Sequence, residues 1–444
     1  MSLLTFKRGI HPHDNKEFTA KIPIKKIKPG KKLYFPINQH LGAPLKPTVS
    51  VGDRVLYGQK IADSDSFVSA PLHSSVSGTV IDIGLYPHHT GVKVPTIVIE
   101  NDELDERTEP INTKSLDELT GKEIVSLVRE AGIVGMGGAG FPTHVKLSPP
   151  ADKKIEYVIV NGAECEPYLT SDHRVMLEEP DDVLFGLKAV MKIFSLEKGY
   201  IAVEENKPDA IKLLKEKAKD YLGAQILTLK KKYPQGAEKQ LIYAVTGKEV
   251  PSGSLPADVG CIVINIDTVT AIARVIKRGI PLTRRIVTIS GGAVANPSNF
   301  KVKIGTSFDD LIEAVGGFVE EPAKIIYGGP MMGVAGTSTS VPVVKGTSAF
   351  LAFTEKEAKI GDETNCLRCG KCIKACPMNL MPAELATYSR MGDDEKIMEY
   401  NALDCLECGS CAYVCPAKRH LVQAIRVGKD RARAYMAAKK AKEQ

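Results

Sequence analysis

The chain has 444 residues, of which 43% are hydrophobic and 25% charged, as in ordinary soluble globular proteins with several cores. Its net charge of +6 is small for this length and argues against a dedicated nucleic-acid-binding protein. The sequence has no apolar run that approaches the roughly 18 residues needed to span a bilayer. Its start does not have the apolar stretch of a secretory signal. We therefore expect a cytosolic chain whose membrane contact is peripheral only.

Residues 1–112 have the alternating pattern of β-strands. Val49–Val55 alternates before a turn at Gly58, and Val76–Ile83 alternates again. The pieces Val-Gly-Asp-x-Val-x-x-Gly-Gln-x-Ile and Ala-Pro-x-x-Ser-x-Val-x-Gly-x-Val resemble the barrel-sandwich hybrid of lipoyl and biotinyl carriers. The expected hairpin tip is filled by His73–Gly78, which contains no lysine. We therefore expect a structural domain rather than a carrier of a swinging-arm cofactor.

Residues 113–283 change to an alternation of short apolar runs and amphipathic stretches. This alternation predicts a Rossmann-like α/β domain with a mostly parallel sheet. The predicted strands cover residues 155–160, 200–203, 225–229 and 261–265. The predicted helices cover residues 116–131, 181–196, 208–222, 237–246 and 269–277.

A glycine-rich stretch, Gly135–Gly140, lies between the first predicted helix and the first predicted strand of this region. It satisfies the pattern G-x-G-x-x-G, but a helix precedes it and Pro142 follows it, so taken alone it is equally well explained as a structural loop. Its glycines would allow the backbone to approach a flat or phosphorylated ligand closely.

Polar residues follow three of the predicted strands, in the stretches 161–166, 233–238 and 265–268. They supply Asn, Glu, Gly and Thr to one edge of the sheet, where ligands of open α/β sheets bind. Each of these residues alone fits a helix cap or a turn. Together with the glycine-rich stretch they predict a binding cleft.

Residues 284–340 return to short strands and indicate a small α+β unit of the β-grasp type. Its predicted strands cover residues 285–290, 300–304 and 324–327, and its predicted helix covers residues 308–315. We expect residues 341–365 to connect this unit to the cysteine-rich region.

Eight of the ten cysteines lie in two runs with the spacing of bacterial ferredoxins. The runs are Cys366, Cys369, Cys372, Cys376–Pro377 and Cys405, Cys408, Cys411, Cys415–Pro416. In each run, C-x2-C-x2-C wraps three thiolates around one [4Fe–4S] cube, and the fourth thiolate ligates the other cube. The first predicted cluster is held by Cys366, Cys369, Cys372 and Cys415. The second is held by Cys405, Cys408, Cys411 and Cys376.

The alternative to iron–sulfur clusters is a pair of zinc knuckles, but zinc sites use paired C-x2-C or Cys/His sets rather than four thiols in eleven residues. Cys165 and Cys261 stand alone and fit small packed residues. We assign residues 341–425 to a helical cluster domain and residues 426–444 to a basic tail. The helical pattern from Lys418 contains nine basic residues against two acidic ones, which fits either a solvated helix or docking to a membrane partner or anionic lipid.

The sequence from Phe6–Lys7–Arg8–Gly9–Ile10–His11–Pro12 to the second cysteine run closely resembles the RnfC family of the Rnf complex. Its middle domain is also similar to the flavin- and NADH-binding subunit of respiratory complex I. The motifs Gly-x-Gly-Gly-Ala-Gly-Phe-Pro-Thr, Asn-x-x-Glu-x-Glu-Pro, Tyr-x-x-Gly-x-Glu and Asn-x-x-Thr stand here in that order. The resemblance implies an FMN site lined by Gly135, Gly137, Gly138, Lys146, Asn161, Glu164, Tyr233, Gly236, Asn265 and Thr268. It implies that Phe141 and two catalytic residues, Glu166 and Glu238, face the nicotinamide nucleotide.

This sequence departs from the complex I pattern at Met136, where the relative has arginine, and at Ala163 and Ala237, where it has acidic residues. Residues 284–340 resemble the soluble-ligand-binding β-grasp (SLBB) module. The resemblance implies an electron-input subunit that passes electrons from NADH through FMN and two [4Fe–4S] clusters to other Rnf subunits, membrane-embedded and iron–sulfur ones included. Its place would be the cytoplasmic side of the cell membrane. The alternatives are a soluble flavin and iron–sulfur reductase, such as a cobalamin reductase, and a non-catalytic electron-wiring subunit without flavin.

Overall fold

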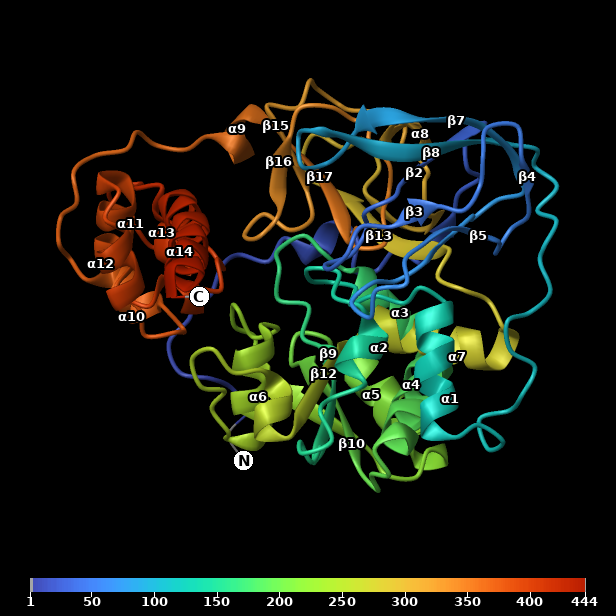
Figure 1. The fold of residues 1–444 in the computed structure, drawn as a ribbon. Coiled ribbons are helices and arrows are strands. Elements are labelled where there is room, and N and C mark those ends of the chain that lie inside the picture. Colours follow the sequence, from blue (N-terminus) through green and yellow to red (C-terminus); the bar gives the residue numbers. More distant parts are fainter. Residues whose placement is uncertain (1–2, 444) are drawn as a thin grey trace.

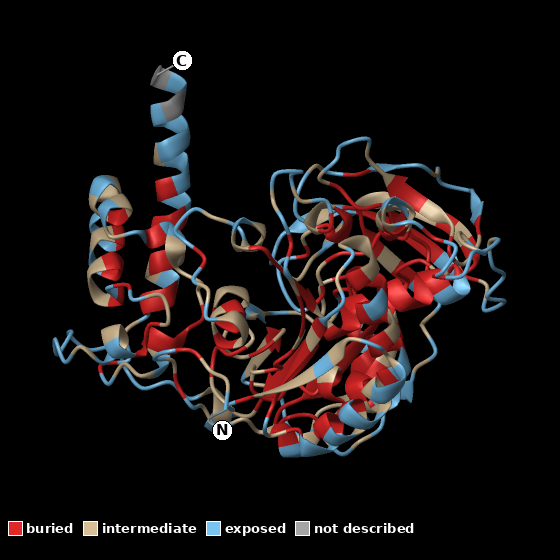
Figure 2. Ribbon diagram, turned by 90° about the horizontal axis from the view of Figure 1, so that it is seen from below, coloured by how far each residue is buried: buried red, intermediate tan, exposed pale blue. Residues whose placement is uncertain are grey.

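The computed structural model describes residues 3–443, which form four modules in chain order (Figure 1). A β module is followed by an α/β domain, a second β-rich module and a helical module that contains both cysteine runs. The helical module stands to one side of the others and is joined to them by a long connection after α9 (Glu355–Ala358). Buried residues fill the interior of each module (Figure 2). Single-turn 3-10 helices are η1 (Lys16–Phe18), η2 (Ala218–Asp220), η3 (Pro256–Val259) and η4 (Ala402–Asp404).

The first module is built from two small sheets with the orders β2-β8-β7-β4 and β3-β5-β6. Its strands are β2 (Lys32–Pro36), β3 (Lys46–Pro47), β4 (Arg54–Val55), β5 (Lys60–Asp63), β6 (Leu72–His73), β7 (Gly78–Pro87) and β8 (Lys93–Asn101). Side chains alternate between the two faces of a strand, so Leu33 and Phe35 point the same way and lie opposite Ile99 and Ile97. All four are fully buried, and the expected β character of this region is confirmed.

The α/β domain contains a four-stranded parallel sheet of order β11-β10-β9-β12. Its strands are β9 (Tyr157–Gly162), β10 (Gly199–Glu204), β11 (Ala224–Leu229) and β12 (Cys261–Asn265). Its helices are α1 (Gly121–Glu130), α2 (Thr143–Lys146), α3 (Ser171–Glu178), α4 (Pro180–Ile193), α5 (Pro208–Lys217), α6 (Glu238–Thr246) and α7 (Ile266–Arg278). Val158 and Val160 pack in the same core as α4 and α7, whereas Ile159 packs with α6. Burial on both faces explains the apolar centres of β9, β10 and β12, whereas the edge strand β11 is only partly buried.

The helices of this domain differ from the prediction at several points, since α2 was not predicted, α5 ends at Lys217 rather than at residue 222, and α7 begins at Ile266 rather than at residue 269. The first helix begins at Gly121 rather than at residue 116, because Thr120 and Glu123 form a capping box that fixes its start. Helix α3 was not predicted, since its eight residues carry only a weak apolar periodicity. It follows β9 directly and brings a further acidic residue, Asp172, to the edge of the sheet.

The second β-rich module has a six-stranded sheet of order β1-β14-β13-β17-β15-β16. Its elements are β1 (Lys25–Lys26), β13 (Arg284–Ser290), β14 (Ser298–Lys303), α8 (Phe308–Ala314), β15 (Lys324–Tyr327), β16 (Val334–Gly336) and β17 (Ala349–Phe353). Strand β17 lies between β13 and β15 and is buried throughout. The expectation that residues 341–365 form only a connection is therefore wrong, and the boundary expected at 340 cuts this sheet.

The helical module packs α10 (Lys371–Ala375), α11 (Pro382–Met391), α12 (Asp394–Glu399), α13 (Ser410–Tyr413) and α14 (Leu421–Glu443) around one core. Leu385, Ile397, Leu421 and Ile425 form its buried centre. The module is tied to its neighbours by α10 and by residues of the cysteine runs, since the carbonyl oxygens of Ile373, Ala375, Pro377 and Cys408 accept hydrogen bonds from outside the module.

Helix α14 confirms the helical pattern of the C-terminal residues and runs across the boundary expected at 425. Its first half packs against α11 and α12, and its second half projects from the module (Figure 2). Lys429 is buried and donates to the Cys405 carbonyl oxygen and to Glu407, while Arg431 pairs with Asp394. These basic residues therefore serve packing within the module.

The side chains of Lys440 and Lys442, which the basic count of the tail includes, lie outside the described residues. None of the described helices is long and apolar enough to cross a membrane.

Candidate functional site

The glycine-rich loop lies beside β9 and β12, between which the order of the strands along the chain reverses. The chain proceeds from β9 through β10 to β11 on one side and then returns to place β12 on the other side of β9. Ligands of open α/β sheets bind at such a switch point. Asn161 at the end of β9 and Asn265 at the end of β12 are direct partners across the two strands. The structure therefore brings these two predicted residues together.

Asn265 joins the glycine-rich loop, α3 and α7. Its Oδ1 accepts a hydrogen bond from the Asp267 backbone N–H (2.8 Å) and caps α7, while its Nδ2 donates to Asp172 Oδ2 (2.7 Å). A Cβ on Gly137, whose φ is +84°, would lie 3.0 Å from Asn265 Nδ2. The Thr268 hydroxyl accepts from the Met136 backbone N–H at 3.0 Å. These contacts hold the loop against the N-terminus of α7.

The glycine-rich loop is open on its outer side. Gly135 donates its N–H to the Phe141 carbonyl oxygen (2.8 Å) and closes the loop, whereas a Cβ on Gly138 would meet nothing within 4 Å. Exposed backbone beside a helix N-terminus is the arrangement that binds phosphate groups. The cradle therefore fits the phosphate of a flavin mononucleotide.

The loop after β11 lies directly on the end of β9. The Asn161 side chain donates to the Gly236 carbonyl oxygen at 2.8 Å and accepts from the Ala163 N–H at 3.1 Å. A Cβ on Gly236 would lie only 2.3 Å from the Ala163 carbonyl oxygen, so a side chain would force the two loops apart. Cys165 accepts from the Gly236 N–H (3.4 Å), which agrees with the packed role expected for it.

Glu164 is buried beside residues that were not predicted. Its Oε1 accepts from the Asp172 N–H at 2.8 Å, and its Oε2 lies 3.8 Å from Lys16 Nζ without a hydrogen-bond partner in the described residues. Burial, together with Glu164 and Asp267, raises the pKa of Asp172 above its usual range. The role of Lys16 could not be found from the sequence, because about 150 residues separate it from this site.

Lys146 and Glu238 form a partly exposed ion pair of 2.7 Å beside the strand ends. Lys146 also donates to the Val263 carbonyl oxygen at 3.0 Å, which anchors the pair to β12. Glu238 is the first residue of α6, and Phe141 lies between the glycine-rich loop and α2. Lys146 ends α2, so its ion pair with Glu238 connects these two helices.

Glu166 lies elsewhere, at the contact with the second β-rich module. Its Oε2 accepts from the Met331 N–H (3.0 Å), and a Cβ on Gly329 would lie 2.2 Å from the same oxygen. Its Oε1 lies 3.3 Å from the Tyr233 hydroxyl, which donates to the Cys408 carbonyl oxygen at 2.7 Å. Burial raises the pKa of Glu166 to about 7. Glu166 and Tyr233 thus form a junction between three modules.

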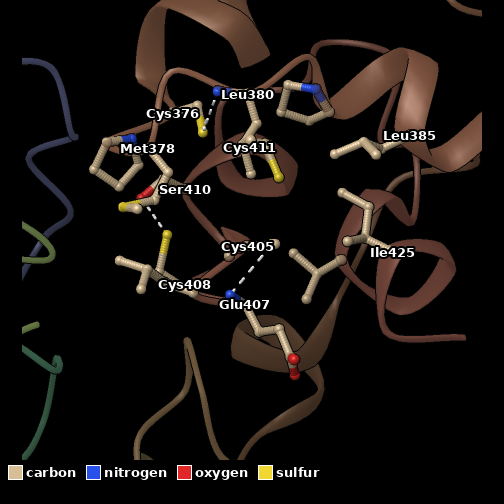
Figure 3. Close-up of a pocket in the computed structure, with 15 residues that line it drawn as sticks. Cys376, Met378, Leu380, Leu385, Cys405, Glu407, Cys408, Ser410, Cys411 and Ile425 are labelled. Atoms are coloured by element: carbon tan, nitrogen blue, oxygen red, sulfur yellow. Dashed lines mark hydrogen bonds between the residues drawn. The ribbon is translucent and has the colours of Figure 1, made fainter. Parts of the chain in front are cut away.

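Four cysteines from both runs line one cavity in the helical module (Figure 3). They are Cys376 of the first run and Cys405, Cys408 and Cys411 of the second. The cavity wall is otherwise mainly apolar, with Leu380, Leu385 and Ile425. Backbone N–H groups of Leu380 and Glu407 point to the sulfur atoms of Cys376 and Cys405, each at 3.4 Å. Four thiols with backbone donors in a closed apolar cavity fit a [4Fe–4S] cluster.

The two runs share one backbone conformation. Arg368 and Glu407 each lie two residues after the first cysteine of a run, have φ of +52° and +57°, and donate their N–H groups to its sulfur atom at 3.4 Å. Gly370 and Gly409 begin the short helices α10 and α13, also at positive φ. Cys366 and Cys369 are exposed, and Cys372 and Cys415 are half-buried. Among the described residues, no group of His, Cys, Asp or Glu side chains lies close enough together to bind a single metal ion. The four thiolates of a [4Fe–4S] cube lie farther apart than the ligands of a single ion, so the spacing of the cysteines is compatible with a cube.

Four family models match successive parts of the chain. The RnfC barrel sandwich hybrid domain matches residues 4–104, and the Nuo51 FMN-binding domain matches residues 128–274. The SLBB domain matches residues 286–335, and the 4Fe-4S dicluster domain matches residues 365–418. These matches confirm the predicted fold class of each module, and the FMN and iron–sulfur domains that it includes.

Similar proteins cover nearly the whole chain. The C subunit of the proton-translocating ferredoxin:NAD(+) oxidoreductase complex of Clostridium ljungdahlii is 52% identical over 99% of this chain and 96% of its own length. The C subunit of the Na(+)-translocating complex of Acetobacterium woodii is 49% identical over 96% of each chain. In fold, the chain is similar to a NAD+-reducing [NiFe]-hydrogenase in the H2-reduced state, with a TM-score of 0.50 and 16% identity over 72% of this chain and 65% of that one. The chain belongs to the RnfC family, the C subunits of ion-translocating oxidoreductase complexes.

Proposed function

We propose that this chain is the NADH-linked electron-input subunit of an ion-translocating ferredoxin:NAD oxidoreductase complex. Relatives of the same length carry the name of that complex. The observation that carries the proposal is the hydrogen bond of 2.7 Å between the Tyr233 hydroxyl and the Cys408 carbonyl oxygen. It joins the loop beside the glycine-rich crevice to the cysteine cavity, so that the two cofactor sites are neighbours in the fold.

The proposal assigns FMN to the crevice between β9 and β12. Thr268, Asn265 and the backbone of Gly137 would hold its phosphate at the N-terminus of α7, where the helix dipole favours an anion. Asn161, Glu164 and Gly236 at the other strand ends would bind its ring system. The remaining residues assigned to FMN are Gly135, Gly138, Lys146 and Tyr233.

The proposal assigns the nicotinamide nucleotide to the outer side of this crevice. Phe141, Lys146 and Glu238 stand at its half-exposed mouth, where an incoming nucleotide would displace water. Glu166 is held at the junction instead, and with a pKa of about 7 its carboxyl group can hold or release a proton near neutral pH. We therefore assign Glu238 to the nucleotide and Glu166 to a proton at the junction.

Bound FMN would supply hydride chemistry with NADH and one-electron release, and the two clusters would supply one-electron transfer. The chain's own contribution is to bind, to orient and to exclude water. Cys405, Cys408, Cys411 and Cys376 would hold the cluster nearer the flavin, and Cys366, Cys369, Cys372 and Cys415 the more exposed one. The exposed cluster would serve the partners, which are other subunits of the complex, membrane-embedded and iron–sulfur subunits among them. We place the chain peripherally on the cytoplasmic side of the membrane.

The test is made on the full chain loaded with FMN, iron and sulfide under anaerobic conditions. We expect NADH to reduce ferricyanide through the flavin and, without ferricyanide, to bleach both clusters. A chain that binds no flavin and does not oxidise NADH would instead be a wiring subunit. A chain that oxidises NADH but does not assemble with membrane subunits on co-expression would be a soluble reductase.

A further inference from the structure

The first residues of the chain lie across the flavin side of the molecule as an extended segment, here called the N-terminal strap (residues 4–16). The Lys230 N–H donates to the Leu4 carbonyl oxygen at 2.9 Å. Ile10 and Tyr233 then exchange two backbone hydrogen bonds of 2.8 and 2.9 Å, as in a short antiparallel pair. The strap therefore extends the sheet edge at the loop that contains Tyr233.

The other side of the strap contacts the helical module. The Gly9 N–H donates to the Ala375 carbonyl oxygen (3.2 Å), and the Arg8 guanidinium donates to the Ile373 carbonyl oxygen (3.0 Å). Both acceptors belong to α10, immediately before Cys376. The strap thus runs between the α/β domain and the helical module, as its dark-blue trace in Figure 1 indicates.

The apolar contact at this junction is centred on the strap. Ile10 packs in one small cluster with Tyr233 of the α/β domain and with Ala375 and Cys408 of the helical module, and all four are at most 8% exposed. The α/β domain also contacts the helical module directly, because the Tyr233 hydroxyl donates to the Cys408 carbonyl oxygen (2.7 Å) and the Gln240 side chain donates to the Pro377 carbonyl oxygen (3.2 Å). The strap therefore contributes Ile10 to the centre of this apolar contact, in addition to its backbone hydrogen bonds.

The backbone of the strap turns sharply at Arg8 and Gly9, between its contacts with the two modules. Arg8 and Gly9 both have positive φ, +63° and +81°, which is uncommon for a residue with a side chain such as arginine. This turn directs one side of the strap to Tyr233 and the other to α10. A Cβ on Gly9 would lie 2.6 Å from the Tyr233 carbonyl oxygen and 2.7 Å from the Phe6 ring, so this position has room only for glycine.

We infer that the N-terminal strap is a positioning element that sets the distance between the flavin crevice and the cysteine cavity, with Gly9 and Ile10 as its positioning residues. The inference rests on the proposed function, because the distance matters only if electrons cross this junction. Electron transfer slows steeply as the separation of donor and acceptor grows. A strap that is displaced from α10 should therefore slow cluster reduction and leave flavin chemistry unchanged.

The test compares Gly9→Ala with the parent chain, both loaded with FMN, iron and sulfide. We expect equal FMN and iron contents and equal NADH–ferricyanide activity, because Gly9 is not among the residues assigned to FMN, to the nucleotide or to a cluster. Stopped-flow mixing with NADH should show flavin reduction at the parent rate and cluster bleaching slowed by roughly tenfold to a hundredfold. The matched control is Gly91→Ala, since Gly91 has a φ of +85° but an added Cβ would meet nothing within 4 Å. It should bleach at the parent rate.

A second readout requires no electron transfer and separates this inference from the proposed function. Limited proteolysis of the exposed connection at residues 359–365 should be faster in Gly9→Ala than in the parent or in Gly91→Ala. If NADH bleaches neither cluster in the parent, the proposed function fails, and proteolysis alone decides whether the strap holds the two modules. Parent-like bleaching, or parent-like proteolysis, in a Gly9→Ala chain with full iron would overturn the strap as a positioning element.

Discussion

Asn265 illustrates how one side chain serves both the fold and the candidate site. Its two side-chain atoms cap α7 and bind Asp172, and the glycine at 137 leaves room for it under the loop. The sequence pattern identified Asn265 because it follows a buried strand. It did not identify Asp172 or Lys16, because a carboxylate in a weakly periodic helix and a lysine near the N-terminus carry no local signal of a shared site.

Substitution of Asn265 tests the flavin assignment. Asn265→Ala removes a hydrogen bond from a buried site, so we expect FMN affinity to fall by roughly tenfold to a hundredfold while iron content stays unchanged. Ser307→Ala is the matched control, because it removes an equivalent cap from α8, outside the α/β domain. Flavin and iron are measured on the purified chains. Full flavin retention in Asn265→Ala would remove our assignment.

Glu166 predicts a pH dependence of stability. Its pKa is raised from the ordinary 4.5 to about 7, so between these values the folded chain binds the proton more tightly than the unfolded chain does. The free energy of unfolding therefore falls as pH rises through this window, and the loss is complete above about pH 7. The Glu166→Gln variant has no carboxyl group to titrate here, so it does not lose this stability. The free energy of unfolding of the variant, relative to that of the parent, should therefore rise with pH by up to roughly 3 kcal/mol.

The measurement is the difference in thermal unfolding midpoint between Glu166→Gln and the parent at about pH 5 and about pH 8. Glu216→Gln, on the exposed face of α5, serves as the control and should give the same difference at both values. A difference for Glu166→Gln that is independent of pH would show that this carboxyl group is not held as we describe.

At the scale of the elements, the strands and helices that the sequence predicts well are those whose own residues determine them. Strands β9, β10 and β12 have apolar and buried centres, and the cysteine spacing repeats the same turn twice. Strand β17 was missed because it is separated from its partners β13 and β15 by glycine- and serine-rich stretches, which indicate a connection. Strand β1 has only two residues, and its pairing with β14 depends entirely on the tertiary structure.

The crossed arrangement that we predict for the two cysteine runs can be tested by cluster identity. Because Cys376 lies in the cavity of the later run, Cys376→Ala should damage the same cluster as Cys411→Ala. Cys369→Ala and Cys415→Ala should damage the other one. Iron content and the electron paramagnetic resonance spectra of the reduced variants separate the two groups. A spectrum of Cys376→Ala that coincides with that of Cys369→Ala would mean that each run holds its own cluster.

At the scale of the whole molecule, Lys345 connects three modules at one buried point. Its Nζ donates to the carbonyl oxygens of Pro71 in the first module and Gly132 in the α/β domain, and its N–H donates to the Gln39 side chain. Burial lowers the pKa of Lys345 to about 7. The chain therefore holds a costly buried amine at the place where its first three modules meet.

Lys345→Met keeps the length of the side chain and removes the donor. Two buried carbonyl oxygens then lose their partner, so we expect a destabilisation of about 1–3 kcal/mol at neutral pH. Denaturant unfolding followed by circular dichroism measures it. Lys356→Met, at an exposed position in α9, is the control and should unfold like the parent. Equal midpoints for Lys345→Met and the parent would show that the amine contributes nothing to the junction.

The N-terminal strap also imposes an order on biosynthesis. Arg8 bonds to Ile373 across 365 residues, so the strap must remain undocked from α10 until the residues between them have been made. The α/β domain can fold meanwhile, since domains of a growing chain generally fold as units. The junction itself forms only when the helical module has been made and closes onto a strap already lying on its neighbour.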